Sequence, residues 1–276
     1  MRVFVTGGSG WIGSAVVPEL LGAGHQVLGL ARSDASAEAL AVAGAEVHRG
    51  SLDDLDCLHA GAAATDGVIH LAFKHDIAFA GDYRGAAEAD LRAIETFGTA
   101  LRGSQRPLVI ASGTAALPPG RVSTERDVPA PDHPLRARFA GEQQAVALAA
   151  DGVRSTTVRL APTVHGNGDS GFVATLIGIA RATGVAGYLG DGSNRWPAVH
   201  RFDAARLFRL ALERAQAGSV LHGVADQGVP VREITHVIAD RLGIPMVAVA
   251  AADAGKHFGF LANVLAADVP ASSALT

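Results

Sequence analysis

A short apolar strand, followed at once by a glycine-rich turn and a helix, opens the chain. Residues 2–6 read RVFVT and the chain continues GGSGWIGSAVVPELL, in which Gly7, Gly10 and Gly13 follow a G-x-x-G-x-x-G spacing. Glycines let the backbone of such a turn bend and approach a ligand, while the positive end of the helix attracts an anion. A strand before the glycines and a helix after them indicate a dinucleotide site and not merely a tight turn.

Strand-like and helix-like segments alternate through the first two thirds of the chain. We expect strands near 2–6, 26–30, 45–48, 67–71, 107–112 and 153–160, and helices near 11–23, 35–43, 54–60, 82–103 and 134–151. Parallel strands connected by helices form a sheet that is covered on both faces. The sequence therefore predicts an α/β protein with a doubly wound, mostly parallel Rossmann sheet.

The alternation changes after residue 165. A helix near 171–183, a glycine-rich passage and a helix near 203–215 follow. We expect residues 1–165 to form a dinucleotide-binding domain and residues 166–276 a smaller substrate-binding region. The 203–226 segment is expected to pack back on the Rossmann sheet.

Charge and cysteine content exclude several classes of partner. The chain has 23 basic and 27 acidic residues, a formal charge of -4, without a long block of either sign. Neither nucleic acid nor an anionic membrane is therefore expected as a partner. Cys57 is the only cysteine, so no internal disulfide is possible. Without a signal-like segment or a long apolar run, we expect a cytoplasmic protein.

The end of the second expected strand bears on the choice of cofactor. An acidic side chain there would bind a free ribose 2′-hydroxyl and repel a 2′-phosphate. This chain instead reads LGLARSD, which places Arg32 and Ser33 at that point. Arg32 can bind a phosphate through two hydrogen bonds and Ser33 can add a hydroxyl donor, so NADP is favoured over NAD. The alternative is a solvated Arg32 with Asp34 capping the next helix.

Further motifs extend these signals over nearly the whole chain. They are RGSLDD (49–54), GVIHLAF (67–73), RLAPTVHG (159–166) and NRWPAVHRFDAARL (194–207). With the glycine turn, they make the chain similar to the extended or atypical short-chain dehydrogenases/reductases of the NAD-dependent epimerase/dehydratase superfamily.

The resemblance implies where a cofactor would lie. Its phosphates would lie against the turn that contains Gly7, Gly10, Trp11, Ile12 and Gly13. The remaining implied contacts are Arg32 and Ser33 at the ribose phosphate, Ser51 and Leu52 at the adenine with Asp53 beside them, Leu71, Ala72 and Phe73 at the central ribose, and Pro162 and Thr163 beside the nicotinamide.

The catalytic pair of this family is missing. The family uses a tyrosine and, four residues later, a lysine, a spacing that brings both to one face of a helix. In the segment RFAGEQ, Arg138 takes the tyrosine position and Glu142 the lysine position. Neither Tyr83 nor Tyr188, the only tyrosines, is followed by such a lysine. We expect Arg138 and Glu142 to form a surface ion pair; alternatively, Arg138 binds an anionic group of the substrate while Glu142 orients it.

Three other residues are candidates for catalysis. Ser112 and Thr114 flank the position of the family's hydroxyl residue, where they could bind a substrate oxygen or merely form a turn. His75 follows the fourth strand, between Lys74 and Asp76, at the sheet edge where ligands bind in open α/β folds. A carboxylate beside His75 would allow it to relay a proton, and a solvated loop is the alternative. No metal site is expected, because the histidines lack ligand spacing.

These observations favour an NADP(H)-dependent oxidoreductase acting on a small or medium carbonyl or enone. The main alternative is a non-catalytic NADP(H)-binding sensor; a sugar-nucleotide epimerase or dehydratase is disfavoured because the tyrosine is missing. Phe172, Tyr188, Trp196 and Phe258 suggest a modest apolar substrate pocket. The alanine-rich helices near 82–103 and 134–151 are suited either to a homodimer interface or to core packing.

Overall fold

The computed structural model describes the backbone of residues 1–276 and all side chains except that of Asn263. The chain divides into two units. The first unit comprises residues 1–113, 129–159 and 201–221, and the second comprises residues 114–128, 160–200 and 222–276. This division differs from the continuous ranges 1–165 and 166–276, because the chain passes between the units several times. The 203–226 segment is itself divided, with residues up to Leu221 in the first unit.

A seven-stranded sheet forms the centre of the first unit, in the order β10-β6-β5-β4-β1-β2-β3. Its strands are β1 (Arg2–Thr6), β2 (Gln26–Ala31), β3 (Glu46–Arg49), β4 (Gly67–His70), β5 (Pro107–Gly113), β6 (Arg154–Leu160) and β10 (Ser219–Gly223). The pairs β1–β2, β1–β4, β2–β3 and β4–β5 are parallel. The predicted Rossmann-like α/β fold is confirmed, and six strands lie within two residues of their expected ends.

The helices of the first unit follow the predicted alternation. They are α1 (Gly13–Gly22), α2 (Asp34–Val42), α3 (Leu55–Ala63), α4 (His75–Phe79), α5 (Tyr83–Leu101), α6 (Phe139–Leu148) and α8 (Arg201–Arg214). The helix expected over 134–151 begins with a 3-10 turn, η2 (Pro134–Arg138), and α6 is shorter than expected. The sequence did not predict α4, a helix of five residues.

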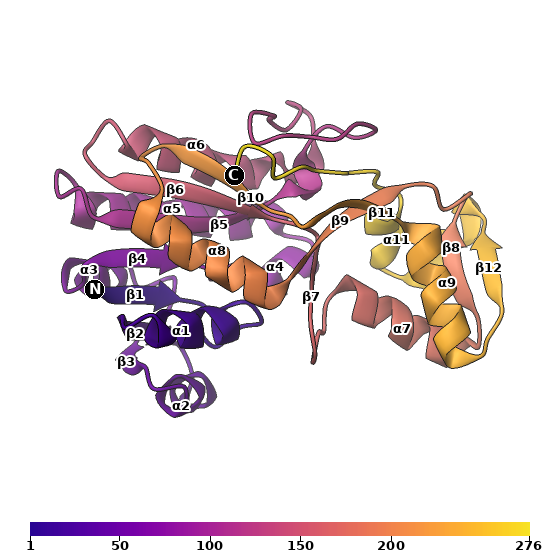
Figure 1. Ribbon diagram of the computed structural model, residues 1–276, viewed down its shortest axis with the longest axis horizontal. Coiled ribbons are helices and arrows are strands. Elements are labelled where there is room, and N and C mark those ends of the chain that lie inside the picture. The colour runs from indigo at the N-terminus through magenta and orange to yellow at the C-terminus, as the bar shows by residue number, and fades with distance from the viewer. The chain divides into compact units, whose positions relative to one another are not determined.

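β1 lies between β4 and β2 near the middle of the sheet (Figure 1), and its side chains alternate between the two faces. The Phe4 ring lies 6.2 Å from the Phe97 ring of α5, edge to face. On the opposite face, Val5 lies beside Val17 of α1 and Leu40 of α2 near the glycine turn. This alternation, with period two, is what buries both faces of a central strand.

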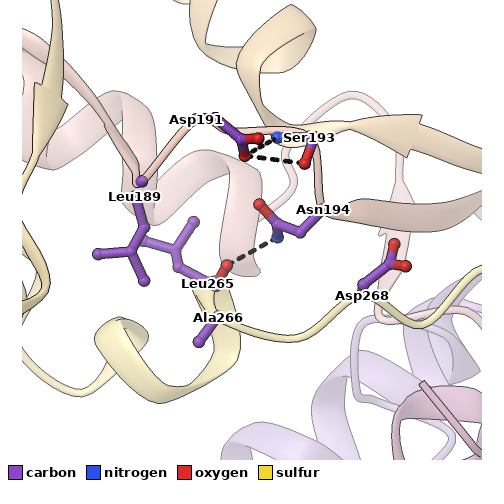
Figure 2. Close-up of a pocket in the computed structure, with 8 residues that line it drawn as sticks. Leu189, Asp191, Ser193, Asn194, Leu265, Ala266 and Asp268 are labelled. Atoms are coloured by element: carbon purple, nitrogen blue, oxygen red, sulfur yellow. Dashed lines mark hydrogen bonds between the residues drawn. The ribbon is translucent and has the colours of Figure 1, made fainter. Parts of the chain in front are cut away.

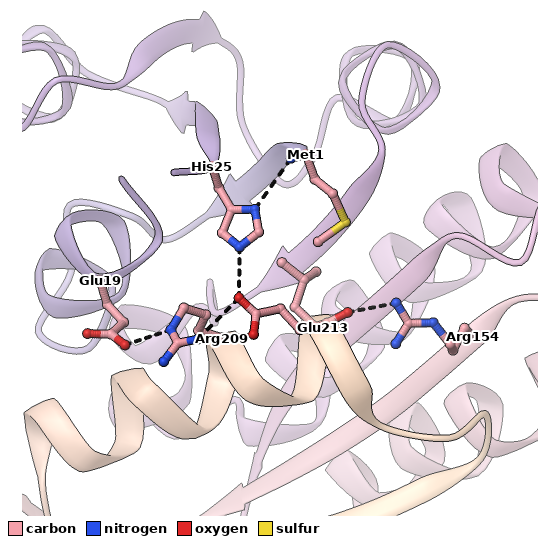
Figure 3. A network of polar contacts seen from close by, with 7 residues as sticks. Met1, Glu19, His25, Arg154, Arg209 and Glu213 are labelled. Carbon is pink, nitrogen blue, oxygen red and sulfur yellow. Dashed lines mark hydrogen bonds and ion pairs between the residues drawn. The ribbon is translucent and has the colours of Figure 1, made fainter. Parts of the chain in front are cut away.

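Polar contacts hold α8 against α1 and the start of β2 (Figure 3). Arg209 donates to Glu19 of α1 at 2.7 Å and to Glu213 at 3.0 Å, and Glu213 also lies 3.0 Å from His25 Nε2. Burial opposes ionisation of Glu213, but its hydrogen bonds with His25 and Arg209 outweigh burial and lower its pKa. Arg154 donates to the Leu212 carbonyl at 2.7 Å. Residues distant in sequence therefore complete the first unit.

The second unit contains two small sheets, ordered β11-β9-β7 and β12-β8. The strands are β7 (Thr163–His165), β8 (Ala186–Leu189), β9 (Arg195–His200), β11 (Asp226–Pro230) and β12 (Met246–Val249). The helices are α7 (Phe172–Thr183), α9 (Val231–Leu242), α10 (Ala254–Phe258) and α11 (Leu261–Leu265). Their apolar faces share a hydrophobic core centred on Trp196, Phe258 and Leu261.

The structure describes the surroundings of Cys57 and the apolar character of the helices. Cys57 lies in α3, partly buried against the core, and its thiol donates to the Arg49 carbonyl at 3.3 Å. Burial, with the charge of Asp54, raises the pKa of this thiol. Among the helices that the structure describes, none has both the length and the apolar character to cross a bilayer.

Candidate functional site

Close packing accounts for the glycines of the β1–α1 turn. Gly7 has a φ of +70°, and a Cβ there would lie 2.7 Å from the backbone nitrogen of Ala72. A Cβ on Gly13 would overlap the carbonyl oxygen of Gly7. Gly10 donates to that same carbonyl at 3.0 Å, which closes the turn. A side chain at Gly7 or Gly13 would collide with backbone atoms, so any larger residue there would distort the turn.

The amino end of α1 is suited to an anion. Ile12 at the N-cap position offers no capping side chain, and the first turn holds no acidic residue. The positive dipole end is therefore not neutralised by the helix itself. The Arg201 guanidinium lies 4.4 Å from the centre of the Trp11 ring, which adds a cation beside the turn. This arrangement fits a dinucleotide's phosphates.

Ser33, and not Asp34, caps α2. Its hydroxyl accepts a hydrogen bond from the Ser36 backbone, and the Ser36 hydroxyl accepts in return from the Ser33 backbone. Asp34 instead forms an ion pair with Arg49 at 2.6 Å. The alternative in which Asp34 is the cap is therefore wrong: a serine at the N-cap can form a capping box that an aspartate one residue later cannot.

Arg32 extends from the end of β2 into solvent. Its side chain is 71% exposed, and its nearest ionic partner is Asp76, at 3.5 Å. Because both groups are exposed, the ion pair is weak. Arg32 is thus a solvated charge, as the alternative expected, and its binding to a ribose phosphate stays a prediction.

The segment expected at the adenine forms a turn of its own. The Ser51 hydroxyl accepts from the Asp53 backbone at 3.2 Å, and Leu52 packs against the hydrophobic core. The Asp53 carboxylate binds the ammonium group of Lys74 at 2.5 Å. This ion pair joins the end of β3 to the segment after β4.

Residues after β4 lie directly against the glycine turn. Leu71 donates to the Thr6 carbonyl at 3.2 Å, and Ala72 donates to the Thr6 hydroxyl at 3.3 Å. The same hydroxyl lies 2.6 Å from His70 Nδ1. The structure therefore brings Leu71 and Ala72 together with Gly7, as the resemblance implied, at the carboxyl edge of the parallel strands.

Glu142 points into the protein and does not form the expected surface pair with Arg138. It is 5% exposed and accepts from the Ser112 hydroxyl at 2.5 Å. Its other oxygen binds Arg159 at 2.7 Å. The surface-pair expectation is wrong because α6 turns Glu142 toward β5 and β6, where a buried carboxylate requires a cation and a hydrogen-bond donor. The hydrogen of Ser112, a predicted catalytic hydroxyl, is thus donated to Glu142.

The guanidinium group of Arg138 lies over the ring of Phe73. Its guanidinium carbon is 4.1 Å from the ring centre, and it donates to the Ala111 carbonyl at 3.0 Å. Arg138 Nε lies 3.9 Å from Asp90, which is bound in turn to His70 at 3.1 Å. With the Thr6–His70 contact, a continuous polar chain runs from the glycine turn to Arg138.

His75 lies among aromatic rings, and its charged neighbours Lys74 and Asp76 pair with other residues. Its ring centre is 5.1 Å from that of Phe73 and 5.6 Å from that of Phe79. Lys74 binds Asp53 and Asp76 binds Arg32, so the expected Lys-His-Asp group does not form. Burial against the rings, and then the charge of Arg138, lower the pKa of His75, against smaller opposing effects that include Asp76 and Asp90. His75 is therefore neutral at pH 7.

Sequence reasoning set Tyr83 aside because it lacks a following lysine. In the structure its ring lies 5.9 Å from the Phe73 ring, at the start of α5. Burial raises its pKa, the charge of Arg138 lowers it, and Asp90 and Glu142 raise it. We name Phe73, His75, Tyr83 and Arg138 the edge cluster. No sequence motif marks Tyr83 as a site residue. Only its nearness to the charge of Arg138, which the fold produces, indicates it.

Thr114, Pro162 and Thr163 belong to the second unit. Thr114 is fully buried, and its hydroxyl donates to the Leu160 carbonyl at 3.4 Å. Pro162 is half-buried. The buried Thr163 hydroxyl has no hydrogen-bond partner among the residues that the structure describes. An unpaired buried hydroxyl costs free energy unless a ligand or water binds it, which fits the predicted ligand-facing role of Thr163.

The aromatic residues expected to line a substrate pocket lie instead in or against the core of the second unit. Trp196 is 1% exposed and Phe258 is 2% exposed, while Phe172 and Tyr188 pack partly against them. The pocket expectation is therefore wrong for Trp196 and Phe258, because their large apolar surfaces are what hold this small unit together.

A polar recess of about 300 Å³ does lie in the second unit (Figure 2). Its polar groups bind one another: Asn194 donates to the Leu265 carbonyl at 2.7 Å, and Asp191 accepts from the Ser193 hydroxyl at 2.8 Å. Asp268 at its rim binds Arg195 at 2.8 Å. These groups are already satisfied within the protein.

Known proteins resemble this chain over most of its length. Residues 3–222 match the model of the NAD dependent epimerase/dehydratase family. Protein C2A9.02 of Schizosaccharomyces pombe is 49% identical, over 100% of this chain and 92% of its own. The 4-hydroxy-2-methyl-3-oxo-4-farnesyl-3,4-dihydroquinoline-1-oxide ketoreductase of Stigmatella aurantiaca is 29% identical, over 94% and 80%.

A solved structure has the same fold. The dTDP-glucose 4,6-dehydratase of Streptomyces venezuelae, with NAD bound, superposes with a TM-score of 0.75 at 22% identity, over 91% of this chain and 84% of that one. The glycine turn, the parallel sheet and the family match agree. The chain belongs to the NAD-dependent epimerase/dehydratase family.

Proposed function

We propose that the protein is an NADP(H)-dependent oxidoreductase that reduces a carbonyl or enone of small or medium size. The β1–α1 turn carries this proposal, because Gly7 and Gly13 clear the space that a diphosphate needs and α1 begins without a cap. The ketoreductase name of the Stigmatella relative supports the reaction class.

Arg32 is the basis for proposing NADP over NAD. An exposed guanidinium at the end of β2, with only a loose ionic partner, supplies two donors to a 2′-phosphate. Neither position 31 nor position 32 carries an acidic side chain, which would favour the free ribose 2′-hydroxyl of NAD.

The bound cofactor would supply a hydride, and the protein would supply a proton and a dry, charged surface. The edge cluster lies at the carboxyl end of β4, where ligands bind in open parallel sheets. Arg138 is fixed there by Phe73 and Ala111, so it can hold a polarised substrate oxygen without reorganising. His75, neutral at pH 7, would relay protons between this surface and water.

Titration with NADPH and NADH tests the proposal, followed by a carbonyl and enone panel monitored by nicotinamide absorbance. We expect wild type to bind NADPH and oxidise it with at least one substrate. Gly13→Ala should abolish binding, whereas Gly22→Ala is the matched control, because a Cβ at Gly22 of α1 meets no atom within 4 Å. Tight binding without turnover would instead favour the sensor; no binding would reject both functions.

Arg32→Ala tests the cofactor preference. Losing a charge-assisted contact of about 1.5–3 kcal/mol should weaken NADPH binding roughly tenfold or more. NADH lacks the phosphate, so its affinity should stay unchanged. Equal losses for both cofactors would contradict the assignment of Arg32.

A further inference from the structure

Tyr83 lies in the edge cluster, although the tyrosine of the family's catalytic pair is missing. Tyr83 is half-buried at the first residue of α5, and within the described chain its hydroxyl makes no hydrogen bond. A tyrosine in a protein interior usually finds a partner for its hydroxyl. One that packs its ring and leaves its hydroxyl free is suited to bind a ligand.

The Phe73 ring brings Tyr83 and Arg138 together. The tyrosine ring lies 5.9 Å from its centre and the guanidinium carbon of Arg138 lies 4.1 Å from it. The η2 turn that carries Arg138 also packs against α5. Arg138 also donates to the Ala111 carbonyl at 3.0 Å and lies 3.9 Å from Asp90, and these contacts limit where its charge can lie.

The charges around Tyr83 oppose one another. Burial raises the pKa of its phenol, and so do Asp90 and Glu142, while Arg138 lowers it. The phenol therefore keeps its proton at neutral pH, as a proton donor must. Arg138 stabilises the phenolate that remains once the proton has left. A lysine has this effect in the family's usual pair; here the cation comes from the helix that normally carries the tyrosine.

We propose that Tyr83 is the proton donor of the reduction and that Arg138 is the positioning residue that stabilises its phenolate. This inference rests on the proposed function. The reduced nicotinamide cofactor, when bound, would supply a hydride to the carbonyl carbon as the carbon–oxygen π bond breaks. The oxygen takes the proton of Tyr83, which leaves an alcohol and a phenolate. The phenolate recovers its proton from water through His75.

Tyr83→Phe tests the proposal by removing one oxygen that makes no hydrogen bond within the described chain. We expect kcat to fall about 10²-fold or more, with the NADPH dissociation constant unchanged. Thr99→Val is the control: it removes a hydroxyl from the exposed face of the same helix, where that hydroxyl donates to the Glu95 carbonyl, and it should leave kcat unchanged. Full turnover by Tyr83→Phe would overturn the proposal.

A measurement without turnover tests the same assignment. In Tyr188→Phe protein with tyrosine labelled by ¹³C at Cζ, Tyr83 gives the only tyrosine resonance. Saturating NADPH should shift this resonance, and Arg138→Gln should move its titration to higher pH. A resonance that ignores NADPH, or that titrates unchanged in Arg138→Gln, would overturn the proposal.

The two proposals fail in distinguishable ways. If wild type does not bind NADPH, the proposed function fails and Tyr83 loses its role with it. If wild type oxidises NADPH and Tyr83→Phe does so equally fast, only the assignment of Tyr83 fails. If wild type binds NADPH without turnover, the reaction is rejected, the proton-donor assignment fails with it, and the resonance shows only whether Tyr83 lies at the cofactor.

Discussion

The aromatic residues of the edge cluster and those in the core of the second unit differ in their surroundings. In the first group, Phe73, His75 and Tyr83 gather at one edge of the sheet, partly open and beside the charge of Arg138. In the second group, Trp196 and Phe258 are buried in an apolar core. Partial exposure beside a fixed charge, and not aromatic content, therefore distinguishes the candidate site from a core.

The largest expected effect separates these two roles. Trp196→Ala should lower the free energy of unfolding by about 3–5 kcal/mol, because it empties a closed core. Phe73→Ala should lower the free energy of unfolding by only about 1–2 kcal/mol, because its ring is half-buried. It should, however, reduce turnover more than Trp196→Ala does. Urea denaturation and steady-state kinetics measure both. If the two variants lost the same stability and the same turnover, the distinction between the candidate site and the core would fail.

A buried ion pair sharpens the contrast within the first unit. Glu142→Ala leaves Arg159 buried without its carboxylate and should cost about 3–5 kcal/mol of unfolding free energy. Glu88→Ala breaks the exposed pair with Arg84 and should cost about 0.5 kcal/mol or less. Both are measured by chemical denaturation.

The double variant Glu142→Met with Arg159→Met separates pairing from packing. Replacing both charges by apolar side chains should recover most of the loss, since no unpaired charge stays buried. A double variant as unstable as Glu142→Ala would instead indicate that the hydrogen bond to Ser112 holds α6 in place.

A smaller effect than that of Glu142→Ala is expected for an ion pair of the second unit. Asp127 has a pKa of about 2, because its hydrogen bond with Arg121 outweighs burial. An unfolded aspartate titrates near about 3.9, so this pair stabilises the folded state above pH ~4 and is lost as the pH falls toward ~2.

Asp127→Asn should remove about 1 kcal/mol or less at pH 7. It should also flatten the loss of stability between pH ~4 and ~2. Thermal unfolding at several pH values measures this. Parallel acid curves for the variant and wild type would show that Asp127 contributes nothing there.

Local patterns predicted the elements of the first unit well. The apolar period of strands and helices, with Gly24 and Gly44 just after their helices at positive φ, placed most ends within two or three residues. The turn glycines were also predictable, since their spacing is local. The partners of Arg138 and Glu142 were not, because helix spacing says which residues share a face and not what that face meets.

The sequence by itself predicted the Rossmann-like sheet and the glycine turn, since the apolar period of each strand and helix and the spacing of the glycines are local patterns. Only the tertiary structure decided that Glu142 binds Ser112 and Arg159 inside, and that Arg138 lies over Phe73 beside Tyr83. The physical reason is that a buried charge takes its partner from whichever strand or helix packs against it, and packing joins residues far apart in sequence.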